Sequence, residues 1–327
     1  MGRSGRISYA DYGRRRVAGE RSVACDLQHA SCIPIRSGKN ARRNRMTTKP
    51  DQTGNDQQAK AAGPAGSSAP KQRSGTLALD LLDLETLTYA GMVACSRVVR
   101  DLGEGAESAE QAAQRIVQHF YDTFRVPRSG ERACALVRCF QTHPYKKLTG
   151  FRRRAAEAGL KGQSAPEGMR CLTLLGTRGV EPEWCDAAKS EGHAAIPLPS
   201  ADVVQRAPMI SRLILQMGIR VEHVLAPTTK ADGLRLDDVS RSYDVFHVER
   251  ARASLFIPAQ ASFVKPYGVR SVVGMGGLLP SGELFAIILF SRVKITREVA
   301  ALFRTLALNV KLALLPFGPD ETFEAPQ

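Results

Sequence analysis

Cysteine offers the most reactive chemistry in this sequence of 327 residues, which contains seven of them. A thiolate can act as a nucleophile, a reductant or a metal ligand, but each role needs a partner group at a suitable spacing. No CxxC pair occurs, and Cys134 and Cys139 lie five apart on an expected strand, which predicts that they face opposite sides. We expect reduced cysteines that pack in the core. Cys171 and Cys185 flank a loop and keep open the alternative of a small thiol-dependent reductase.

Histidine is the residue type most often found in metal and haem sites, and four of the five histidines in the expected folded part are candidates. His143, His193, His223 and His247 match neither a helical HxxxH pair nor a CxxC…H pattern. We therefore expect structural or surface histidines and no metal site. His193 and His247 remain candidate ligand contacts, because both lie in segments expected beside a pocket.

The spacing of Gly274, Gly276 and Gly277 is similar to that of a glycine-rich phosphate-binding loop. The Lys-Ser/Thr pair of such a loop is missing, however, and no helix is expected to begin after it. Glycine within a strand more often permits a bulge, or the close approach of a ligand or a neighbouring backbone. We expect a strand here. Because the sequence contains no complete enzyme signature, we expect no catalysis.

Aromatic residues gather in the irregular segments between the expected strands. They could cover a small-molecule pocket in which polar side chains fix the ligand, or they could seal an exposed sheet face; both interpretations stay open. The sequence identifies neither the ligand nor a cofactor. The candidate ligand-binding residues are Trp184, His193, Tyr243, Phe246, His247, Phe256, Gln260, Tyr267 and Arg270.

The net charge of +14 is concentrated near the N-terminus. Residues 1–45 carry eleven basic and three acidic residues, and residues 46–73 carry four basic and two acidic residues, which leaves +4 for everything that follows. A basic globular face that binds nucleic acid is therefore not expected, although the arginine clusters of residues 1–45 keep a nucleic-acid contact open. The sequence has no apolar run long enough for a membrane span and no secretory signal, so we expect a cytoplasmic protein.

Composition divides the chain into three parts. Residues 1–74 are rich in Arg, Gly, Ser, Gln and Pro without a hydrophobic period, which predicts a disordered tail. Met46 and the residues after it resemble a natural start, so we hypothesise that residues 1–45 are not translated. Residues 75–317 have the periodic apolar pattern of a folded domain, and residues 318–327 form a polar C-terminal tail.

Apolar periodicity and end signals predict the elements of the folded part. Ser108 and Gln111 form a capping box at the start of one helix, and Ser200 or Asp202 caps another. The predicted helices are 77–102, 109–126 and 200–217, and the predicted strands are 133–140, 170–175 with a stop at the glycines of 176–179, 194–198 with an edge position, and 242–248.

The C-terminal segment predicts a buried hairpin that leads into a long helix. Strands are expected at 271–279 and 284–290, joined by a turn in which Gly282 adopts a left-handed conformation. Thr296 predicts the N-cap of the last helix, which extends to Leu315. This helix is apolar on more than one face, so we expect it to pack against the first helix, in the same chain or across a dimer.

This order of elements resembles a GAF-like sensor domain, of the type found at the N-terminus of bacterial histidine kinases and related signalling proteins. The resemblance covers about residues 75–317. The sequence lacks the bilin-linking and cyclic-nucleotide patterns of other GAF domains, so the resemblance does not imply a bilin or cyclic-nucleotide ligand. The segments that carry it are 133–138, THPY at 142–145, 171–175, GHAAIPLPS at 192–200, 208–211, 243–248, 256–260 and 266–315.

The resemblance implies an α+β domain with an antiparallel GAF-like sheet, terminal helices packed on one face and a homodimer formed through them. It also implies a pocket on the opposite face, which must then stay free to hold a ligand. No kinase, cyclase or DNA-binding signature follows residue 317, so a histidine kinase or another signalling output protein is the expected partner. We interpret the chain as a non-catalytic sensory or regulatory domain that binds a small molecule or a signalling partner.

Overall fold

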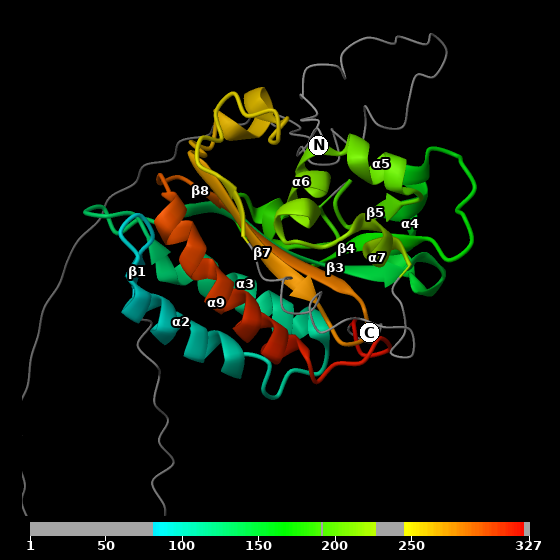
Figure 1. The fold of residues 1–327 in the computed structure, drawn as a ribbon, viewed down its shortest axis with the longest axis horizontal. Coiled ribbons are helices and arrows are strands. Elements are labelled where there is room, and N and C mark those ends of the chain that lie inside the picture. Colours follow the sequence, from blue (N-terminus) through cyan, green and yellow to red (C-terminus); the bar gives the residue numbers. More distant parts are fainter. Residues whose placement is uncertain (1–80, 191, 227–244, 324–327) are drawn as a thin grey trace, which may run out of the picture. The chain divides into compact units, whose positions relative to one another are not determined.

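The computed structural model describes residues 81–190, 192–226 and 245–323. Its centre is a six-stranded antiparallel sheet with the strand order β5-β4-β3-β8-β7-β6 (Figure 1). The predicted α+β class with an antiparallel sheet is confirmed, while the predicted tail at residues 1–74 lies outside the described residues. The strands are β3 (Cys134–Pro144), β4 (Arg170–Gly179), β5 (Ala195–Leu198), β6 (Phe246–Val248), β7 (Ser271–Leu278) and β8 (Leu284–Ser291).

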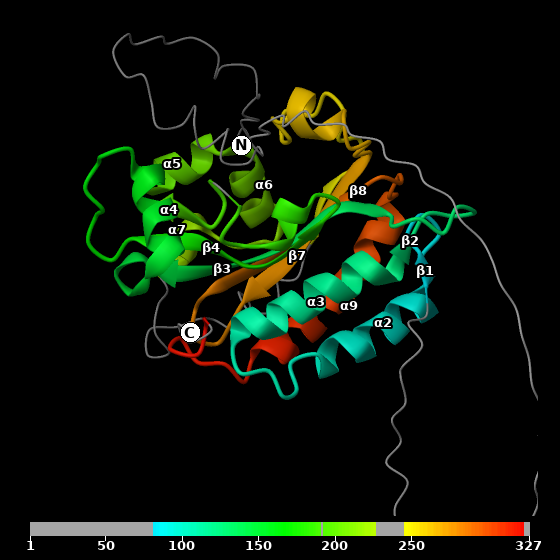
Figure 2. The ribbon, with the colours of Figure 1, turned by 180° about the vertical axis from the view of Figure 1, so that it is seen from behind.

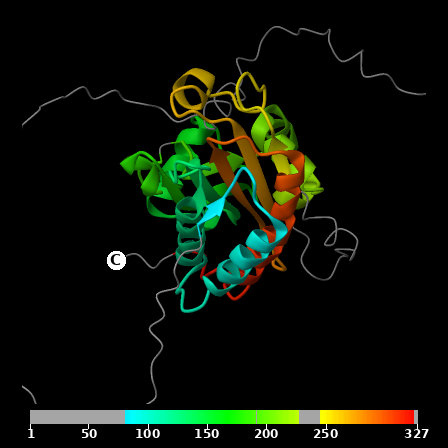
Figure 3. The same ribbon diagram turned by 90° about the vertical axis from the view of Figure 1, so that its left-hand side faces the viewer.

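Three helices cover one face of the sheet: α2 (Tyr89–Asp101), α3 (Ala109–Thr123) and α9 (Arg297–Leu314). Helix α2 packs against α9, α3 contacts β3 and β4, and α9 contacts β7. Figures 2 and 3 show α2 lying alongside α9. The first and the last helix thus lie side by side, as their apolar faces indicate. None of the described helices is both long and apolar enough to cross a lipid bilayer.

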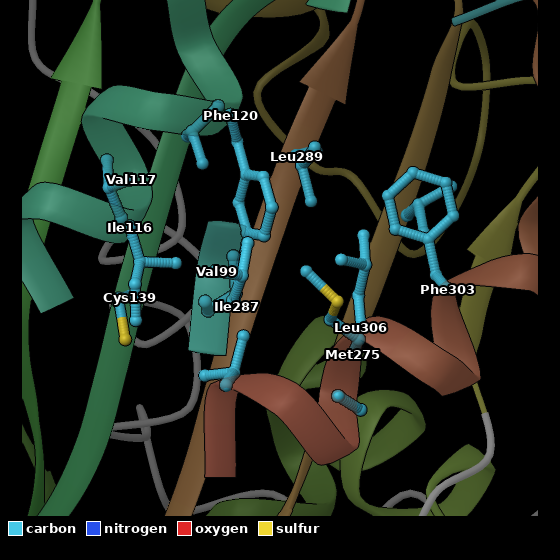
Figure 4. Close-up of a cluster of buried hydrophobic side chains, with 14 of the residues drawn as sticks. Val99, Ile116, Val117, Phe120, Cys139, Met275, Ile287, Leu289, Phe303 and Leu306 are labelled. Atoms are coloured by element: carbon cyan, nitrogen blue, oxygen red, sulfur yellow. The ribbon is translucent and has the colours of Figure 1, made fainter. Parts of the chain in front are cut away.

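The core beneath these helices is formed by all three of them together with β3, β7 and β8. Figure 4 shows Phe303 and Leu306 of α9, Phe120 of α3, and Ile287 and Leu289 of β8 in this cluster. Each of these side chains is fully buried. The apolar residues recur every three or four positions on the helices and every second position on β8, which is why the same layer collects them.

The opposite face of the sheet is covered as well. Its apolar residues pack with those of α6, notably Met209, Ile210 and Leu213, in a second core (Figure 1). The expectation that this face stays free for a ligand is therefore wrong, because the apolar stripe of α6 is buried against the sheet. The elements on this side are η2 (Pro182–Cys185), α5 (Ala201–Arg206), α6 (Pro208–Gln216), α7 (Val221–Leu225) and the π-helix η3 (Gln260–Val264).

Smaller elements lie outside the main sheet. β1 (Leu82–Asp83) pairs in parallel with β2 (Phe124–Arg125), and η1 (Tyr145–Lys147) precedes α4 (Gly150–Leu160). Residues 318–323 lie beyond the predicted end of the domain but still contact it. The carbonyl oxygens of Glu321 and Thr322 accept hydrogen bonds from the amides of Ala109 and Glu110, which begin α3.

The local end signals read from the sequence are confirmed. Ser108 Oγ accepts a hydrogen bond from the amide of Gln111 at 3.1 Å, and Thr296 Oγ1 accepts one from Val299 at 3.4 Å. Gly282 has a φ of 89°, so the hairpin turn uses the left-handed conformation that favours glycine. These signals succeed because each depends on atoms only two or three residues apart.

Three predicted helices differ from the structure. The one expected at 109–126 ends at Thr123, because Phe124 is extended and Phe124–Arg125 form β2. The one expected at 77–102 begins at Tyr89, because Thr88 caps it and residues 81–88 form β1 and a turn in which Asp83 accepts amide hydrogen bonds. The helix expected at 200–217 is divided into α5 and α6. Pro208 lacks an amide hydrogen and restricts the residue before it, so Ala207 leaves the helical conformation.

Strand β4 continues to Gly179 and does not stop at the glycines as predicted. Gly176 lies against α3, where an added Cβ would be 2.8 Å from the carbonyl oxygen of Ala113. Glycine at this position therefore permits close contact between helix and strand and does not end the strand.

A β-bulge in β3 changes which face its residues occupy. The pairing of β3 with β8 shifts between Cys134 and Leu136, so one extra residue enters the strand and the alternation moves by one position. Cys134, Val137 and Cys139 consequently all belong to the core beneath α2, α3 and α9. The prediction that Cys134 and Cys139 face opposite sides is wrong for this reason.

Candidate ligand-binding site

A small cavity lies between the sheet and α6, on the face opposite α9. Its volume is about 40 Å³. Eight of its ten lining residues are apolar, and the two polar ones are Arg138 of β3 and His193, which precedes β5. We call it the Arg138 cavity. Its lining residues are Arg138, Phe140, Leu172, His193, Ile196, Met209, Ile210, Leu213, Ile288 and Phe290.

Arg138 sits at the centre of the sheet, paired with Thr177 of β4 on one side and Ile288 of β8 on the other. The residue is only 3% exposed. Within the described residues no hydrogen bond or ion pair reaches its guanidinium, and Nε is a buried donor without a partner. Burial lowers the pKa of Arg138 to about 9. The group is still a cation at neutral pH, because that pKa lies well above 7.

His193 is the second polar side chain of the cavity and is also buried. A tight turn before β5 holds its backbone, since the amide of His193 donates to the carbonyl oxygen of Ser190 at 3.0 Å. Both polar groups of the cavity therefore come from the framework of the sheet and the turn beside it. Such placement on rigid elements is typical of residues that orient a small ligand.

Three of the predicted ligand contacts are packing residues of the second core. Trp184 packs against Tyr267 with the two rings tilted and their centroids 4.6 Å apart, and both contact Phe263. Burial, together with a hydrogen bond to Glu181, raises the pKa of Tyr267 to about 12. Phe246 is fully buried on β6. These aromatics seal the sheet face, the second of the two interpretations that the sequence leaves open.

The other predicted contacts lie away from the Arg138 cavity lining. His247 Nε2 bonds the carbonyl oxygen of Ile295 at 2.9 Å, because alternation along β6 turns it away from Phe246. Gln260 bonds four backbone groups of the loop at 251–257. Phe256 and Arg270 are exposed, and Tyr243 lies outside the described residues. His193 is the member of the predicted set that lines the cavity.

Sequence reasoning missed Arg138, although the sequence does carry a signal for it. The residue interrupts the apolar run Leu136-Val137-Arg138-Cys139-Phe140 of a strand expected to be buried. Charged residues are almost never fully buried unless they are paired. A charge at the centre of a buried strand therefore marks a position where a counter-charge or a ligand is needed.

The five cysteines in the described part of the chain do not form the pairs that thiol chemistry would need. Cys185 Sγ bonds the carbonyl oxygen of Gly179, eight residues along β4 from Cys171, which separates the two thiols by about 26 Å at the usual rise of a strand. Cys95 contacts His119 at 3.6 Å, but burial raises the pKa of the Cys95 thiol to about 12. Burial also raises the thiol pKa of Cys134, Cys139 and Cys171 to about 12.

Two further features bear on chemistry. His143 is buried near Arg170, and desolvation followed by this charge lowers its pKa to about 4, so it is neutral at pH 7. Across the described ranges, no three His, Cys, Asp or Glu side chains converge as a metal site requires. An open depression of about 500 Å³ lies where the hairpin turn meets the end of α9, and its lining carries no charged side chain that would select a ligand.

Comparison with known proteins gives no further information about this site. No model of a known protein family matches the chain, and no curated protein is significantly similar to it. The functional assignment therefore rests on the Arg138 cavity and on the helices across the sheet from it.

Proposed function

We propose that residues 75–317 form a GAF-like, non-catalytic sensory or regulatory domain that binds a small molecule in the Arg138 cavity. The observation that carries this proposal is the buried cation of Arg138, which lines an apolar cavity and has no ion-pair partner among the described residues. A few polar groups converging in an apolar hollow are the usual composition of small-molecule sites. The high thiol pKa values of Cys95, Cys134, Cys139 and Cys171 weigh against the reductase alternative, which needs a thiolate.

Strand β8 offers a route from the cavity to the helices. Ile288 lines the Arg138 cavity, while its neighbours Ile287 and Leu289 face the opposite core with Phe303 and Leu306 of α9 (Figure 4). A ligand that favours one packing of β8 would therefore favour one position of α9. The shift in population cannot exceed the difference in ligand affinity between the two arrangements.

The cavity part of the proposal is tested by filling the hollow from α6. Ile210→Phe places a larger side chain at the cavity wall, whereas Leu215→Phe enlarges a side chain of the same helix that is 65% exposed. The probe is a panel of two- to four-carbon carboxylates, amides and alcohols, read as a shift in Tm of the full chain, together with native mass spectrometry for a retained molecule. We expect wild type and Leu215→Phe to respond and Ile210→Phe to lose the response.

The opposite result would contradict the proposal. Binding that survives in Ile210→Phe would put the ligand elsewhere. A wild-type protein that retains nothing and responds to no member of the panel would remove the Arg138 cavity as a binding site.

Helix α9 also supports the homodimer part of the proposal. Leu308, Leu312 and Leu315 are 46%, 41% and 47% exposed, at spacings of four and three residues. Apolar residues repeated in this way form the seam between paired helices. A second α9 packed on this seam would form the homodimer. We propose that the dimer passes the ligand-bound state to a histidine kinase or another signalling output protein in the cytoplasm.

In size-exclusion chromatography with light scattering, we expect the wild-type protein to have twice the 35.5 kDa mass of a single chain. The double variant Leu308→Glu/Leu312→Glu should be monomeric, because four like charges would meet across the seam. Leu215→Glu, an equally polar change at an exposed leucine of α6, should leave the mass unchanged. A monomeric wild type at micromolar concentration, or a dimeric double variant, would rule out this interface.

A further inference from the structure

The geometry points to a short-chain aliphatic carboxylate as the class of ligand, with its carboxylate held by Arg138 and its carbon chain held by the apolar wall of the cavity. This inference rests on the proposed function, because it uses the same cavity. It goes further by assigning the ligand a charge, a size and the residue that selects it.

The first argument comes from comparing the three buried arginines of the described residues. Arg170 is paired with Glu283 at 3.3 Å, and Arg152 is paired with Glu110. Arg138 is the most deeply buried of the three and has no such partner in the described part of the chain. A buried ion without a counter-charge is strongly unfavourable. The pattern of the other two indicates that Arg138 requires an anion.

The second argument concerns the shape and chemistry of the cavity. A guanidinium is planar and presents parallel N–H donors, which match the two oxygens of a carboxylate. Among the described residues that line the cavity none is acidic, and the one permanent charge is the cation of Arg138, which favours an anion. The surrounding leucine, isoleucine, methionine and phenylalanine side chains favour a hydrocarbon group over a fully hydrated inorganic ion.

The third argument is size. One water occupies about 10–15 Å³ of a cavity, so a hollow of about 40 Å³ holds a ligand of only a few non-hydrogen atoms. Acetate, with its four non-hydrogen atoms, is of this size, whereas the larger propionate and butyrate require some displacement of the wall. Larger anions such as nucleotides are excluded unless the core opens.

The test compares each carboxylate with its uncharged analogue in the full-length protein at constant ionic strength. Propionate should raise Tm and give a measurable Kd by titration calorimetry, whereas propionamide and propanol should bind at least tenfold more weakly. In Arg138→Met the affinity for propionate should fall at least tenfold. Without ligand this variant should keep or raise its Tm, because it removes an unpaired buried charge. Arg170→Met is the control for a paired buried arginine: it should lower Tm and leave propionate binding intact.

Arg138→Lys provides a second variant that keeps the charge. It should bind propionate more weakly than wild type and more tightly than Arg138→Met, because lysine lacks the bidentate fork. Equal binding of propionate and propionamide would overturn the assignment of the ligand while leaving a small-molecule cavity in place. Equal binding of propionate by wild type and Arg138→Met would also overturn it. Failure of every compound to bind wild type, with no retained molecule, would instead remove the proposed function itself.

Discussion

Phe303→Ala should lower the free energy of unfolding by about 3–5 kcal/mol, the usual cost of removing a buried aromatic side chain. Phe303 of α9 lies in the core shown in Figure 4 and is 0% exposed; its ring centroid is 5.9 Å from that of Phe124 in β2. Its removal leaves a hollow in the core that joins the helices to the sheet. Because the surrounding backbone is fixed by the strands, the site can collapse only in part.

The measurement is urea unfolding at one protein concentration, followed by the fluorescence of Trp184, the single tryptophan of the chain. Trp184 is buried on the opposite face of the sheet, so the mutation does not touch the probe. Leu215→Ala removes an exposed apolar side chain and should change stability by less than about 0.5 kcal/mol. A loss below about 1 kcal/mol for Phe303→Ala would contradict the described packing of α9.

Glu283→Gln should cost about 3–5 kcal/mol, because it leaves Arg170 as a buried charge without a partner. The two side chains are 7% and 8% exposed and lie 3.3 Å apart, joining the start of β4 to the β7–β8 turn. Arg170 also donates to the carbonyl oxygen of Thr142 at 3.3 Å. This carbonyl is neutral, and so is the glutamine of the variant, so neither supplies the counter-charge that Glu283 provides. The pair therefore fixes the hairpin turn against the rest of the sheet.

Two further variants separate charge from packing. Arg170→Met/Glu283→Leu should recover most of the loss, because an apolar pair of similar volume avoids burying either ion. Glu157→Gln, in the exposed pair with Arg153, should change stability by less than about 0.5 kcal/mol. If Glu283→Gln were as mild as Glu157→Gln, the ion pair at the turn would not be buried as described.

The predictions that held are those based on neighbouring residues. Ser108, Thr296 and Gly282 act as the sequence predicts, since a cap or a turn is decided by a few atoms nearby in the chain. The positions of the main strands along the chain follow from apolar runs of the right length, whereas the antiparallel sheet is what the GAF-like resemblance implies. The same reasoning erred at β1 and at Ala207, where competing local signals were present but were given too little weight.

The residues of the candidate site were harder to predict from the sequence than the helices and strands. Of its polar residues, His193 was predicted and Arg138 was not. Aromatic residues such as Trp184 and Tyr267 suggested a pocket, but in the folded chain they pack against one another and close the sheet face. Residue type alone could not separate a side chain that lines a cavity from one that fills it.

The sequence by itself determined an α+β chain whose last sixty residues form a buried hairpin and a helix apolar on several sides. Its information is local, because dihedral preferences, caps and apolar periods act over a few residues. The folded arrangement was needed to see that α6 covers the second face, that a bulge sets Cys134 and Cys139 on one side, and that Arg138 is buried with no counter-charge among the described residues. These depend on packing and electrostatic contacts between segments far apart in the chain, which no local pattern specifies.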